Sequence, residues 1–381
     1  MSTIKNKQVA IVGGGPGGLT LARLLHLKGA NVKVYERDLN KDVRVQGATL
    51  DLHDDSGLEA LREAGLMEAF KENYRPGADR TRIGDKHATI LLDEQGRDKN
   101  EMSRPEIDRG PLRKMLLDSL APGIVVWNSY LVSLVRSGSG WQLNFQNGTS
   151  AIADIVIAAD GANSKIRPLI TSIKPFYSGV TIVEGSVYNS AEAAPRIHSL
   201  LNGGKLFIMG DSKTLIISSK GDGSLVFYTG CKTSEHWYRE SGIDFDNKTQ
   251  VKNWFLHEFA GWDSIWLELF ENAEPHFIPR PQYCMPTDQR WTALPDITML
   301  GDAAHLMPPY AGEGVNMAMQ DALELSNCLT DPAFADVHEA IAHYEKQMCT
   351  RAGEIATMTL EQTALLHSPD AIPHMLELLG Q

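Results

Sequence analysis

The alternation of apolar and polar positions at the start of the chain predicts a strand, a tight turn, a helix and a second strand. Residues 8–12 (QVAIV) form a short apolar run that ends in the glycine-rich sequence GGGPGG. Apolar residues then recur at helical spacing over residues 19–29, and Gly29 stands where a helix C-terminal glycine is common. Residues 31–36 (NVKVYE) indicate a second strand. Strand, helix and strand in this order are typical of the parallel unit of a doubly wound α/β sheet.

The pattern changes in the middle of the chain and again toward its end. Over residues 176–275, short β-type runs such as KLFIMG and LVFYTG are separated by turn clusters, which favours a largely antiparallel sheet. After the run ITML the α/β character returns, and from about Gly314 onward the pattern is mainly helical. The predicted fold class is α/β, with a discontinuous Rossmann-like nucleotide-binding domain, a β-rich substrate-binding domain and C-terminal helices that brace both. The predicted bounds are 1–75, 104–175 and 276–335 for the first, 76–103 and 176–275 for the second, and 336–381 for the helices.

Composition narrows the class of protein. Of the 381 residues 43% are hydrophobic and 22% charged, which is typical of a folded chain, and the net charge of −12 opposes binding to nucleic acid. No run of about 20 apolar residues predicts a membrane span, and the N-terminus has no signal-peptide pattern. The four cysteines form no C-x-x-C pair, so neither a metal site nor a disulfide framework is indicated. We expect a soluble, cytoplasmic monomer.

Glycine spacing makes the first loop a candidate dinucleotide site. Gly13, Gly15 and Gly18 match the G-x-G-x-x-G pattern, in which glycine permits a tight bend and the close approach of a pyrophosphate to a helix N-terminus. Glu36 ends the second strand 21 residues after Gly15, where an acid accepts hydrogen bonds from an adenosine ribose. The motif in this context predicts a bound dinucleotide and leaves NAD and FAD both open.

Two further motifs follow apolar runs later in the chain. The sequence DIVIAADGANSKIR contains the turn Asp160–Gly161, and residues 301–316 read GDAAHLMPPYAGEGVN. Together with the first loop, these motifs resemble those of the class A flavin monooxygenases, the para-hydroxybenzoate hydroxylase-like family. The resemblance covers most of the chain and implies FAD as the cofactor and NADPH or NADH as the reductant. The first loop would then hold the AMP end of FAD and the loop at 301–316 its reactive end.

The resemblance also assigns FAD contacts. Asp302 would bind the ribityl chain, and the backbone near Asn316 would lie at the pyrimidine end of the isoalloxazine ring. Glycines at 312 and 314 let the main chain approach a flat ring, and a helix N-terminus there faces the negative charge of reduced flavin. Pro308 and Pro309 would stiffen the wall beside the ring. The predicted cofactor-binding residues are Gly13, Gly15, Gly18, Glu36, Arg37, Arg44, Arg109, Asp160, Asp302, Gly312, Gly314, Val315 and Asn316.

Several of these charged residues allow two interpretations. Asp160 lies near the pyrophosphate and is linked to NAD(P)H use in the family, but an Asp-Gly turn also simply ends a strand. IDRGPL resembles the family's I-x-R-x-x-L, which makes Arg109 a cofactor-side candidate, whereas Arg113, one turn later, is expected to form a structural ion pair. Arg44 is either the mobile-loop arginine near the flavin or a solvated charge.

Two histidines lie in or near these motifs. His305 is in the loop at 301–316 and suggests a general base, but a hydrogen-bonded structural histidine is the preferred interpretation. His53, in the sequence TLDLHDD, has no partner that the sequence identifies and is taken as structural.

The reaction that the resemblance implies is a hydroxylation. NAD(P)H reduces FAD, O2 adds to form a flavin C4a-hydroperoxide, and an electron-rich substrate attacks its distal oxygen. No catalytic side chain is assigned, because the flavin carries the chemistry. The partners are O2 and a small aromatic or polyketide-type substrate, and the nicotinamide nucleotide would bind transiently, since only one dinucleotide fold is visible.

Within the family, the tetracycline-inactivating monooxygenases are similar in TLDLH and in GDAAHLMPP-AG-GVN. The substrate half departs from them, because Glu184, Lys205 and Val226 stand where those enzymes use a glutamine, an arginine and a histidine. We expect these three residues, with Tyr228 and Pro309, to line the substrate, and Glu184 to pair with Lys205 or with a ligand donor. In the alternative interpretation both charges are merely solvated. Tetracyclines are expected to be turned over weakly or not at all.

Other functions remain as alternatives. A nicotinamide-linked dehydrogenase would need only the first loop, and a flavin halogenase would need a tryptophan-x-tryptophan motif that GWDSIW does not match. A flavin-dependent oxidoreductase without oxygen insertion and a non-catalytic flavin-binding protein stay open.

Overall fold

The protein is described by a computed structural model over residues 3–43, 49–94 and 104–378. It forms two compact units, each built from separated segments. Unit 1 comprises Met1–Tyr74, Arg109–Phe176 and Cys284–Met358; unit 2 comprises Arg75–Asp108, Tyr177–Tyr283 and Thr359–Gln381. The functional assignment of these units, and the bracing role of the C-terminal helices, stay predictions.

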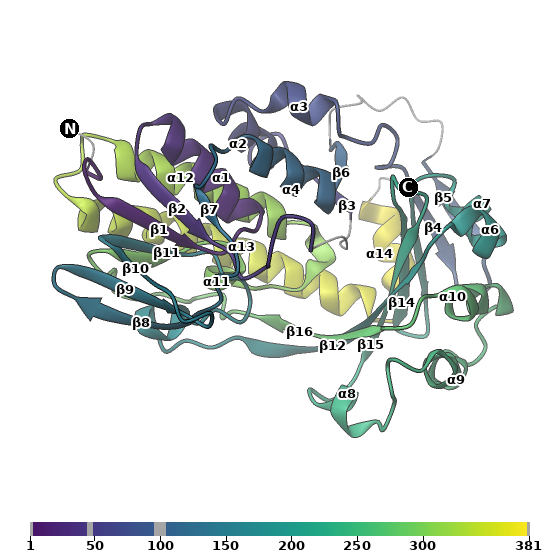
Figure 1. The fold of residues 1–381 in the computed structure, drawn as a ribbon. Helices are drawn as coiled ribbons and strands as arrows, with labels where there is room; N and C mark the ends of the chain where they lie inside the picture. Colours follow the sequence, from purple (N-terminus) through teal and green to yellow (C-terminus); the bar gives the residue numbers. More distant parts are fainter. Residues whose placement is uncertain (1–2, 44–48, 95–103, 379–381) are drawn as a thin grey trace. The chain divides into compact units, whose positions relative to one another are not determined.

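Unit 1 is organised around a five-stranded parallel sheet in the order β17–β11–β1–β2–β7 (Figure 1). The central strand, β1 (Gln8–Val12), pairs in parallel with β2 (Asn31–Tyr35) and with β11 (Ile155–Ala158). Every residue of β11 and of β17 (Ile297–Met299) is buried, as expected for strands that are covered on both faces. The doubly wound α/β arrangement predicted from the pattern is confirmed.

Helices and a small antiparallel sheet complete unit 1. α1 (Pro16–Leu27) packs on β1, on β2 and on α12 (Gly314–Thr330). The three-stranded sheet has the order β10–β9–β8. The remaining elements are β3 (Thr49–Asp51), α2 (Gly57–Glu63), α3 (Met67–Lys71), α4 (Arg109–Asp118), β7 (Val125–Val126), β8 (Leu131–Ser137), β9 (Gly140–Phe145), β10 (Ser150–Ala153), α5 (Arg167–Ile170), α11 (Asp302–His305), the 3-10 helix η2 (Pro309–Ala311) and α13 (Val337–Leu366), which continues into unit 2.

Unit 2 is organised around a seven-stranded sheet in the order β16–β12–β15–β14–β13–β4–β5. Neighbouring strands from β12 to β13 are antiparallel, and β13 pairs in parallel with β4. Its strands are β4 (Thr81–Asp85), β5 (Ile90–Asp93), β12 (Phe176–Val187), β13 (Lys205–Gly210), β14 (Lys213–Ser219), β15 (Leu225–Lys232) and β16 (Ile278–Cys284); β6 (Glu106–Asp108) lies outside this sheet. Its other elements are α6 (Ser190–Ala193), α7 (Pro195–Leu201), α8 (Trp237–Glu240), α9 (Lys248–Glu258), η1 (Ser264–Trp266), α10 (Leu267–Asn272) and α14 (Ala371–Leu378).

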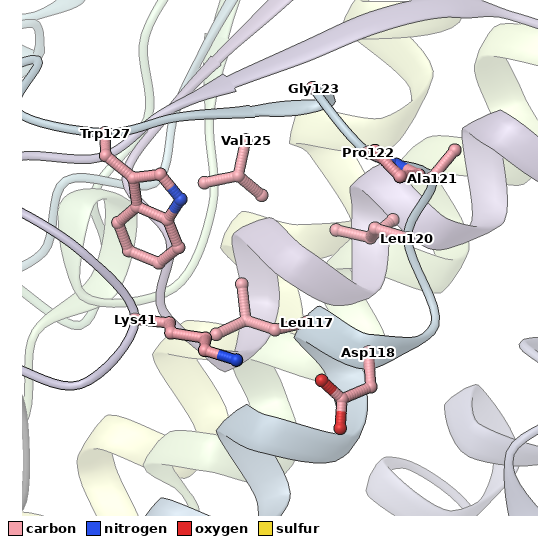
Figure 2. A pocket seen from close by; sticks show the side chains of 9 residues that line it. All are labelled: Lys41, Leu117, Asp118, Leu120, Ala121, Pro122, Gly123, Val125 and Trp127. Atoms are coloured by element: carbon pink, nitrogen blue, oxygen red, sulfur yellow. The ribbon is translucent and has the colours of Figure 1, made fainter.

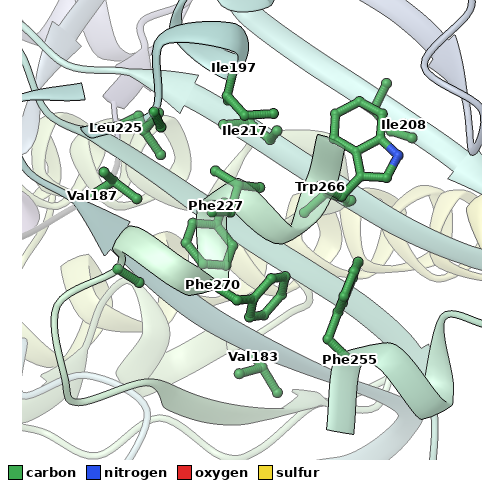
Figure 3. Close-up of a cluster of buried hydrophobic side chains, with 14 of the residues drawn as sticks. Val183, Val187, Ile197, Ile208, Ile217, Leu225, Phe227, Phe255, Trp266 and Phe270 are labelled. Carbon is green, nitrogen blue, oxygen red and sulfur yellow. The ribbon is translucent and has the colours of Figure 1, made fainter. Parts of the chain in front are cut away.

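One face of this sheet holds the core of unit 2. Phe227 of β15 packs among aromatic side chains of α9 and α10, with its ring centroid 5.1 Å from that of Phe270 (Figure 3). Because side chains alternate along a strand, the neighbours of Phe227, which are Val226 and Tyr228, point to the opposite face. Helices α7, α9 and α10 contribute to the core on the first face. On the second face, Thr214 Oγ1 of β14 lies 3.4 Å from His367 Nε2, and α14 packs on β13 and β4.

The helices between residues 190 and 272 were not predicted from the pattern. Val251, Phe255 and Phe259 are spaced four apart, which is the period that places side chains on one side of a helix. They join the buried cluster of unit 2. A second difference concerns β16, which was expected with the nucleotide-binding domain and instead extends the sheet of unit 2 beyond β12.

Candidate functional site

The three sequence motifs follow the carboxyl ends of three adjacent parallel strands. Gly13 comes directly after β1, Asp160 follows β11, and Gly301 follows β17. Parallel strands end at the same edge of a sheet, and in doubly wound folds ligands bind at that edge. The fold thus brings together segments that lie almost 300 residues apart in the sequence.

The glycines of the first loop differ in whether the structure leaves room for a side chain. A side chain at Gly13, where φ is +114°, would place Cβ 2.2 Å from the carbonyl oxygen of Ala159. A Cβ at Gly18 would lie 2.2 Å from the carbonyl oxygen of Gly13, so this glycine lets α1 pack closely on the loop. At Gly15, by contrast, a Cβ would meet no atom within 4 Å. The loop is close-packed at Gly13 and Gly18 and has open space at Gly15. A pyrophosphate site needs such open space beside a tightly packed turn.

Glu36 lies directly beside this loop and is 2% exposed. Its Oε2 accepts a hydrogen bond from the Gly14 amide (2.6 Å) and its Oε1 from the Asp38 amide (3.0 Å). The side chain is therefore held at the end of β2, where the predicted ribose contact requires it. Arg37 is exposed next to it.

Arg113 forms the structural ion pair that was predicted for it. Its Nη2 donates to Asp38 Oδ2 (3.0 Å), and both side chains are nearly buried. Its guanidinium also lies 5.5 Å from the ring centroid of Trp127. Arg109 is exposed at the start of α4, and its predicted role on the cofactor side stays a prediction. Arg44 falls outside the described residues.

A shallow pocket of unit 1 lies near this ion pair (Figure 2). It is lined by residues 117, 118 and 120–123 around the end of α4, together with Lys41, Val125 and Trp127. None of the predicted cofactor-binding residues lines it, and we assign it no role.

The two carboxylate oxygens of Asp160 differ in their contacts with the described residues. Oδ2 accepts a hydrogen bond from the Lys165 amide (2.8 Å), whereas Oδ1 is buried and has no hydrogen-bond partner among the described residues. Burial raises the pKa of Asp160, and the hydrogen bonds with Ser164 and with the Lys165 amide oppose that rise. A buried acceptor without a donor is costly, so this oxygen is suited to a hydroxyl of a ligand.

Arg167 connects the Asp160 turn to the second loop. Its Nε donates to the carbonyl oxygen of Ala303 (2.6 Å) and its Nη2 to that of Asp302 (2.7 Å). With its backbone held in this way, the side chain of Asp302 is exposed at the first position of α11. Pro308, further along the loop, is buried, and Pro309 is exposed.

His305 is buried in an ionic network. Its Nε2 lies 2.6 Å from Asp321 Oδ2, and the other oxygen of Asp321 accepts from Arg351 Nη2 (2.7 Å). Burial alone would lower the pKa of His305, but the charge of Asp321 raises it; the pKa of Asp321 is lowered, because His305 and Arg351 outweigh the effect of its burial. Asp321 Oδ2 also accepts from the Gly301 amide (2.9 Å). This geometry agrees with the structural interpretation of His305.

The second loop leads directly into α12. Gly312 has φ +73°, and Gly314 begins the helix with no atom within 4 Å of a built Cβ; Val315 follows half-buried. Asn316 is fully buried, and its Nδ2 donates to the carbonyl oxygen of Asp51 (2.9 Å). The helix start is therefore open on one side and attached to the end of β3 on the other.

His53 has partners that the sequence did not reveal. Its Nε2 lies 3.1 Å from Asp51 Oδ2, and its Nδ1 lies 3.4 Å from Glu313 Oε2. The sequence identified no partner for His53, and the structure supplies these two. Asp51 is two residues before it, a signal the sequence offered, but Glu313 is 260 positions away and only the fold brings it near.

The predicted substrate-binding residues of unit 2 lie on one face of its sheet. Val226 and Tyr228 alternate with Phe227, and strand register places Glu184 opposite Tyr228. Lys205 is opposite Ser218, which is itself opposite Val226. All four predicted residues are thus on the face away from the buried cluster. Pro309 belongs to unit 1.

Of the two partners expected for Glu184, Lys205 is wrong, and a donor on the ligand stays a prediction. Glu184 Oε2 accepts from Arg280 Nε (2.6 Å), and Lys205 Nζ donates to Glu106 Oε1. Register explains the difference, because β12 and β13 are separated by two strands, while β16, which carries Arg280, is adjacent to β12. Arg280 lay in a segment that the sequence analysis had assigned to the other domain.

Comparison with known proteins identifies the family. A family profile described as "FAD binding domain" matches residues 6–181 and 290–356, which is more than half of the chain. The chain belongs to this family of class A flavin monooxygenases. It is accordingly a flavoprotein monooxygenase, and FAD is its cofactor.

Relatives and solved structures extend over nearly the whole chain. The monooxygenase asqM of Emericella nidulans is 31% identical, covering 96% of this chain and 96% of its own. The 3-amino-4-hydroxybenzoate 2-monooxygenase PtnB3 of Streptomyces platensis is 30% identical over 95% of this chain and 89% of its own. The crystal structure of tetracycline destructase Tet(55) matches with a TM-score of 0.74 and 20% identity, covering 94% of this chain and 89% of its own. At that identity the match shows a shared fold.

The residues of unit 1 fit FAD. The open space at Gly15, the unsatisfied Oδ1 of Asp160 and the exposed Asp302 all follow strands that end at one sheet edge. FAD is an extended molecule with a pyrophosphate and several hydroxyls. Its site therefore needs backbone amides that bind phosphate and, further along the cofactor, oxygen atoms that accept hydrogen bonds from its hydroxyls. Among the described residues, no cluster of His, Cys, Asp or Glu could hold a metal ion. None of the described helices is long and apolar enough to span a membrane.

Proposed function

We propose that this protein is an FAD- and NAD(P)H-dependent monooxygenase that hydroxylates a planar, polar aromatic or polyketide-type small molecule. The observation that carries the proposal is the second face of the sheet in unit 2. Strand register aligns Glu184, Tyr228, Ile216 and Phe207 in one row across four strands, and all four are half-buried rather than fully buried.

This row suits a flat ligand. Tyr228 and Phe207 offer ring surfaces, and Ile216 lies between them. Aromatic side chains with a few convergent polar groups are typical of small-molecule sites. Glu184, paired with the half-exposed Arg280, supplies a polar contact at one end of the row. The relative PtnB3 is named for a small aromatic acid, which is consistent with such a surface.

When bound, FAD supplies the redox chemistry by which NAD(P)H and O2 are used. The chain's own residues bind and orient it. The loop at Gly15 accommodates the pyrophosphate, Glu36 accepts from a ribose, and Asp160 and Asp302 accept from further hydroxyls. The amides at the start of α12 favour negative charge on the ring, because a helix N-terminus carries partial positive charge. A single dinucleotide motif implies that the nicotinamide nucleotide binds transiently.

The test is a substrate panel with two readouts. Purified holoenzyme is mixed with NADPH or NADH and with 3-amino-4-hydroxybenzoate, other hydroxylated aromatic acids, or tetracycline. We expect at least one aromatic compound to stimulate NAD(P)H oxidation and to gain the mass of one oxygen atom, and tetracycline to react weakly or not at all. NAD(P)H oxidation that yields only hydrogen peroxide with every compound contradicts oxygen insertion. Efficient oxygen transfer to tetracycline contradicts the expected selectivity.

Variants connect the activity to the sheet face. Tyr228→Ala should lower kcat/KM for a confirmed substrate by about tenfold, the size expected for one well-buried aromatic contact. Glu192→Gln, on the surface of α6 in the same unit, is the matched control and should leave kcat/KM unchanged. If both variants behave as the wild type, the substrate does not bind on this face.

A further inference from the structure

The two ring nitrogens of His53 both face carboxylates. Asp51 Oδ2 lies 3.1 Å from Nε2, and Glu313 Oε2 lies 3.4 Å from Nδ1. A neutral imidazole has one N–H and can donate to only one of them, whereas an imidazolium donates to both. The side chains are 11%, 20% and 16% exposed for His53, Asp51 and Glu313, so solvent screens these contacts only partly.

The backbone around His53 is attached to the same helix start. The His53 amide donates to Asn316 Oδ1 (2.9 Å), and Asn316 Nδ2 donates to the carbonyl oxygen of Asp51 (2.9 Å). A Cβ built on Gly312 would lie 3.3 Å from Asp51 Oδ1. The segment at 51–53 therefore contacts the end of the second loop through a side-chain bridge and through an amide bridge.

We propose that protonated His53 is a positioning residue for the flavin, which holds Glu313 and the start of α12 against the end of β3. The inference rests on the assignment of the second loop to the reactive end of FAD. Loss of the proton removes the hydrogen bond that His53 donates to one of the two carboxylates, and with it the positive charge that lies between them. The helix start is released, and its amides are no longer fixed where the ring needs them. FAD affinity falls in proportion to the fraction of molecules that keep the binding geometry.

The sign of the pH dependence follows from the groups that face His53. Burial lowers the pKa of His53, but the hydrogen bonds and charges of Asp51 and Glu313 outweigh this effect and raise it from 6.5 to about 9. When the helix start is released, the pKa returns toward its ordinary value. The stabilisation of the helix start by protonated His53 is therefore complete below about pH 6.5. It declines as the pH rises toward 9 and is absent at higher pH.

The experiment measures the dissociation constant of FAD from the apoprotein between pH 6 and 10, by flavin fluorescence, for the wild type and for His53→Gln, Glu313→Gln and the double variant. At pH 6 to 7, His53→Gln should weaken FAD binding by about tenfold, which corresponds to one hydrogen bond between charged groups. The wild type should lose affinity as the pH rises toward 9, and both single variants should lack this step. The double variant should be no weaker than His53→Gln, since both changes remove the same interaction.

His257→Gln is the matched control, because His257 is exposed on α9 of unit 2. It should retain the affinity and pH step of the wild type. If the wild type binds FAD but His53→Gln keeps both its affinity and the pH step, the positioning role of His53 is refuted. If His53→Gln lowers thermal stability while FAD affinity and its pH step persist, the residue is merely structural and the proposal also fails. A wild type that binds no FAD contradicts the proposed function instead.

Discussion

The two glycine-containing loops of unit 1 are held in place by different means. The loop at Gly13–Gly18 is held by backbone contacts, since side chains at Gly13 and Gly18 would collide with carbonyl oxygens. The loop at 301–316 is held by ionic side chains, because His305, Asp321 and Arg351 anchor its first half. At Gly13 and Gly18 the first loop tolerates no added atoms, whereas a loop held by charges responds to pH and to the loss of one partner.

The difference between steric and ionic anchoring also explains which loop can be predicted well from the sequence. Steric requirements select glycine at fixed spacing, and that spacing can be recognised in the sequence. Ionic anchors come from α12, α13 and the end of β3, at separations that no local pattern encodes. The four predictions that follow test this contrast, beginning with the largest expected effect.

Gly13→Ala should prevent stable folding of unit 1. Its Cβ would lie 2.2 Å from the Ala159 oxygen at a φ of +114°, so β1 and β11 cannot keep their spacing. We expect a loss of roughly 5 kcal/mol or more in the free energy of unfolding, measured by denaturant titration of the apoprotein. A variant that unfolds at the wild-type denaturant concentration would show that the loop can relax, and the contrast would disappear.

Asp321→Asn should destabilise the second loop strongly. His305 and Arg351 would lose the carboxylate that both contact, which breaks a buried ionic network. The expected loss is about 3 to 4 kcal/mol in the free energy of unfolding. Glu324→Gln is the matched control, because Glu324 also pairs with Arg351 but is 25% exposed. Equal losses in the two variants would show that burial of Asp321 does not matter.

Glu345→Gln should stabilise the protein above neutral pH. Glu345 accepts hydrogen bonds from Trp291 and from Thr298, which lies in β17, the strand that precedes the second loop. Burial raises the pKa of Glu345 to about 7 despite these hydrogen bonds. The folded state therefore keeps a proton that the unfolded state loses, and stability declines as the pH rises from 4.5 to about 7. Removing the charge should add about 2 kcal/mol at pH 8 and flatten the decline. Thermal unfolding at pH 5 and pH 8 measures both effects, and an unchanged slope would contradict the assignment.

Gly15→Ala should leave the apoprotein almost unchanged and impair FAD binding. A Cβ at this position meets no atom within 4 Å, and φ is −79°, which alanine adopts readily. The change in the free energy of unfolding should stay within about 0.5 kcal/mol. FAD affinity should fall, because the added methyl group occupies the space assigned to the pyrophosphate. Wild-type FAD affinity in this variant would place the pyrophosphate elsewhere.

Local patterns predicted the elements of unit 1 well. The run QVAIV became β1, the run KLFIMG in unit 2 became β13, and the apolar spacing after Pro16 became α1. Each of these segments has a hydrophobic period that matches its structure, so neighbouring residues alone are sufficient to predict the strand or helix. The helices from 190 to 272 were not predicted, because the short β-type runs of that region favoured strands.

Pairing between distant side chains was predicted least well. Glu184 was expected to meet Lys205 or a ligand donor, yet strand order placed Arg280 beside it. No partner for His53 could be named from the sequence, and the fold places it between Asp51 and Glu313. The order of strands in a mixed sheet and the place where a helix starts in space depend on the whole chain, so the partner of a charged residue cannot be inferred from its neighbours.

The sequence by itself indicated a dinucleotide-binding loop, because glycine at 13, 15 and 18 and an acid at 36 suit the shape of a dinucleotide and leave a recognisable spacing. Tertiary structure alone decided which distant side chains meet. It set the protonation of His53 and Glu345, the anchoring of the second loop by Asp321, and the row of Glu184, Tyr228, Ile216 and Phe207 on one sheet face. The physical reason is range: strand and helix periods and the glycine spacing can be recognised among nearby residues, whereas the contacts of charges and the register of a sheet join residues that only the fold brings close.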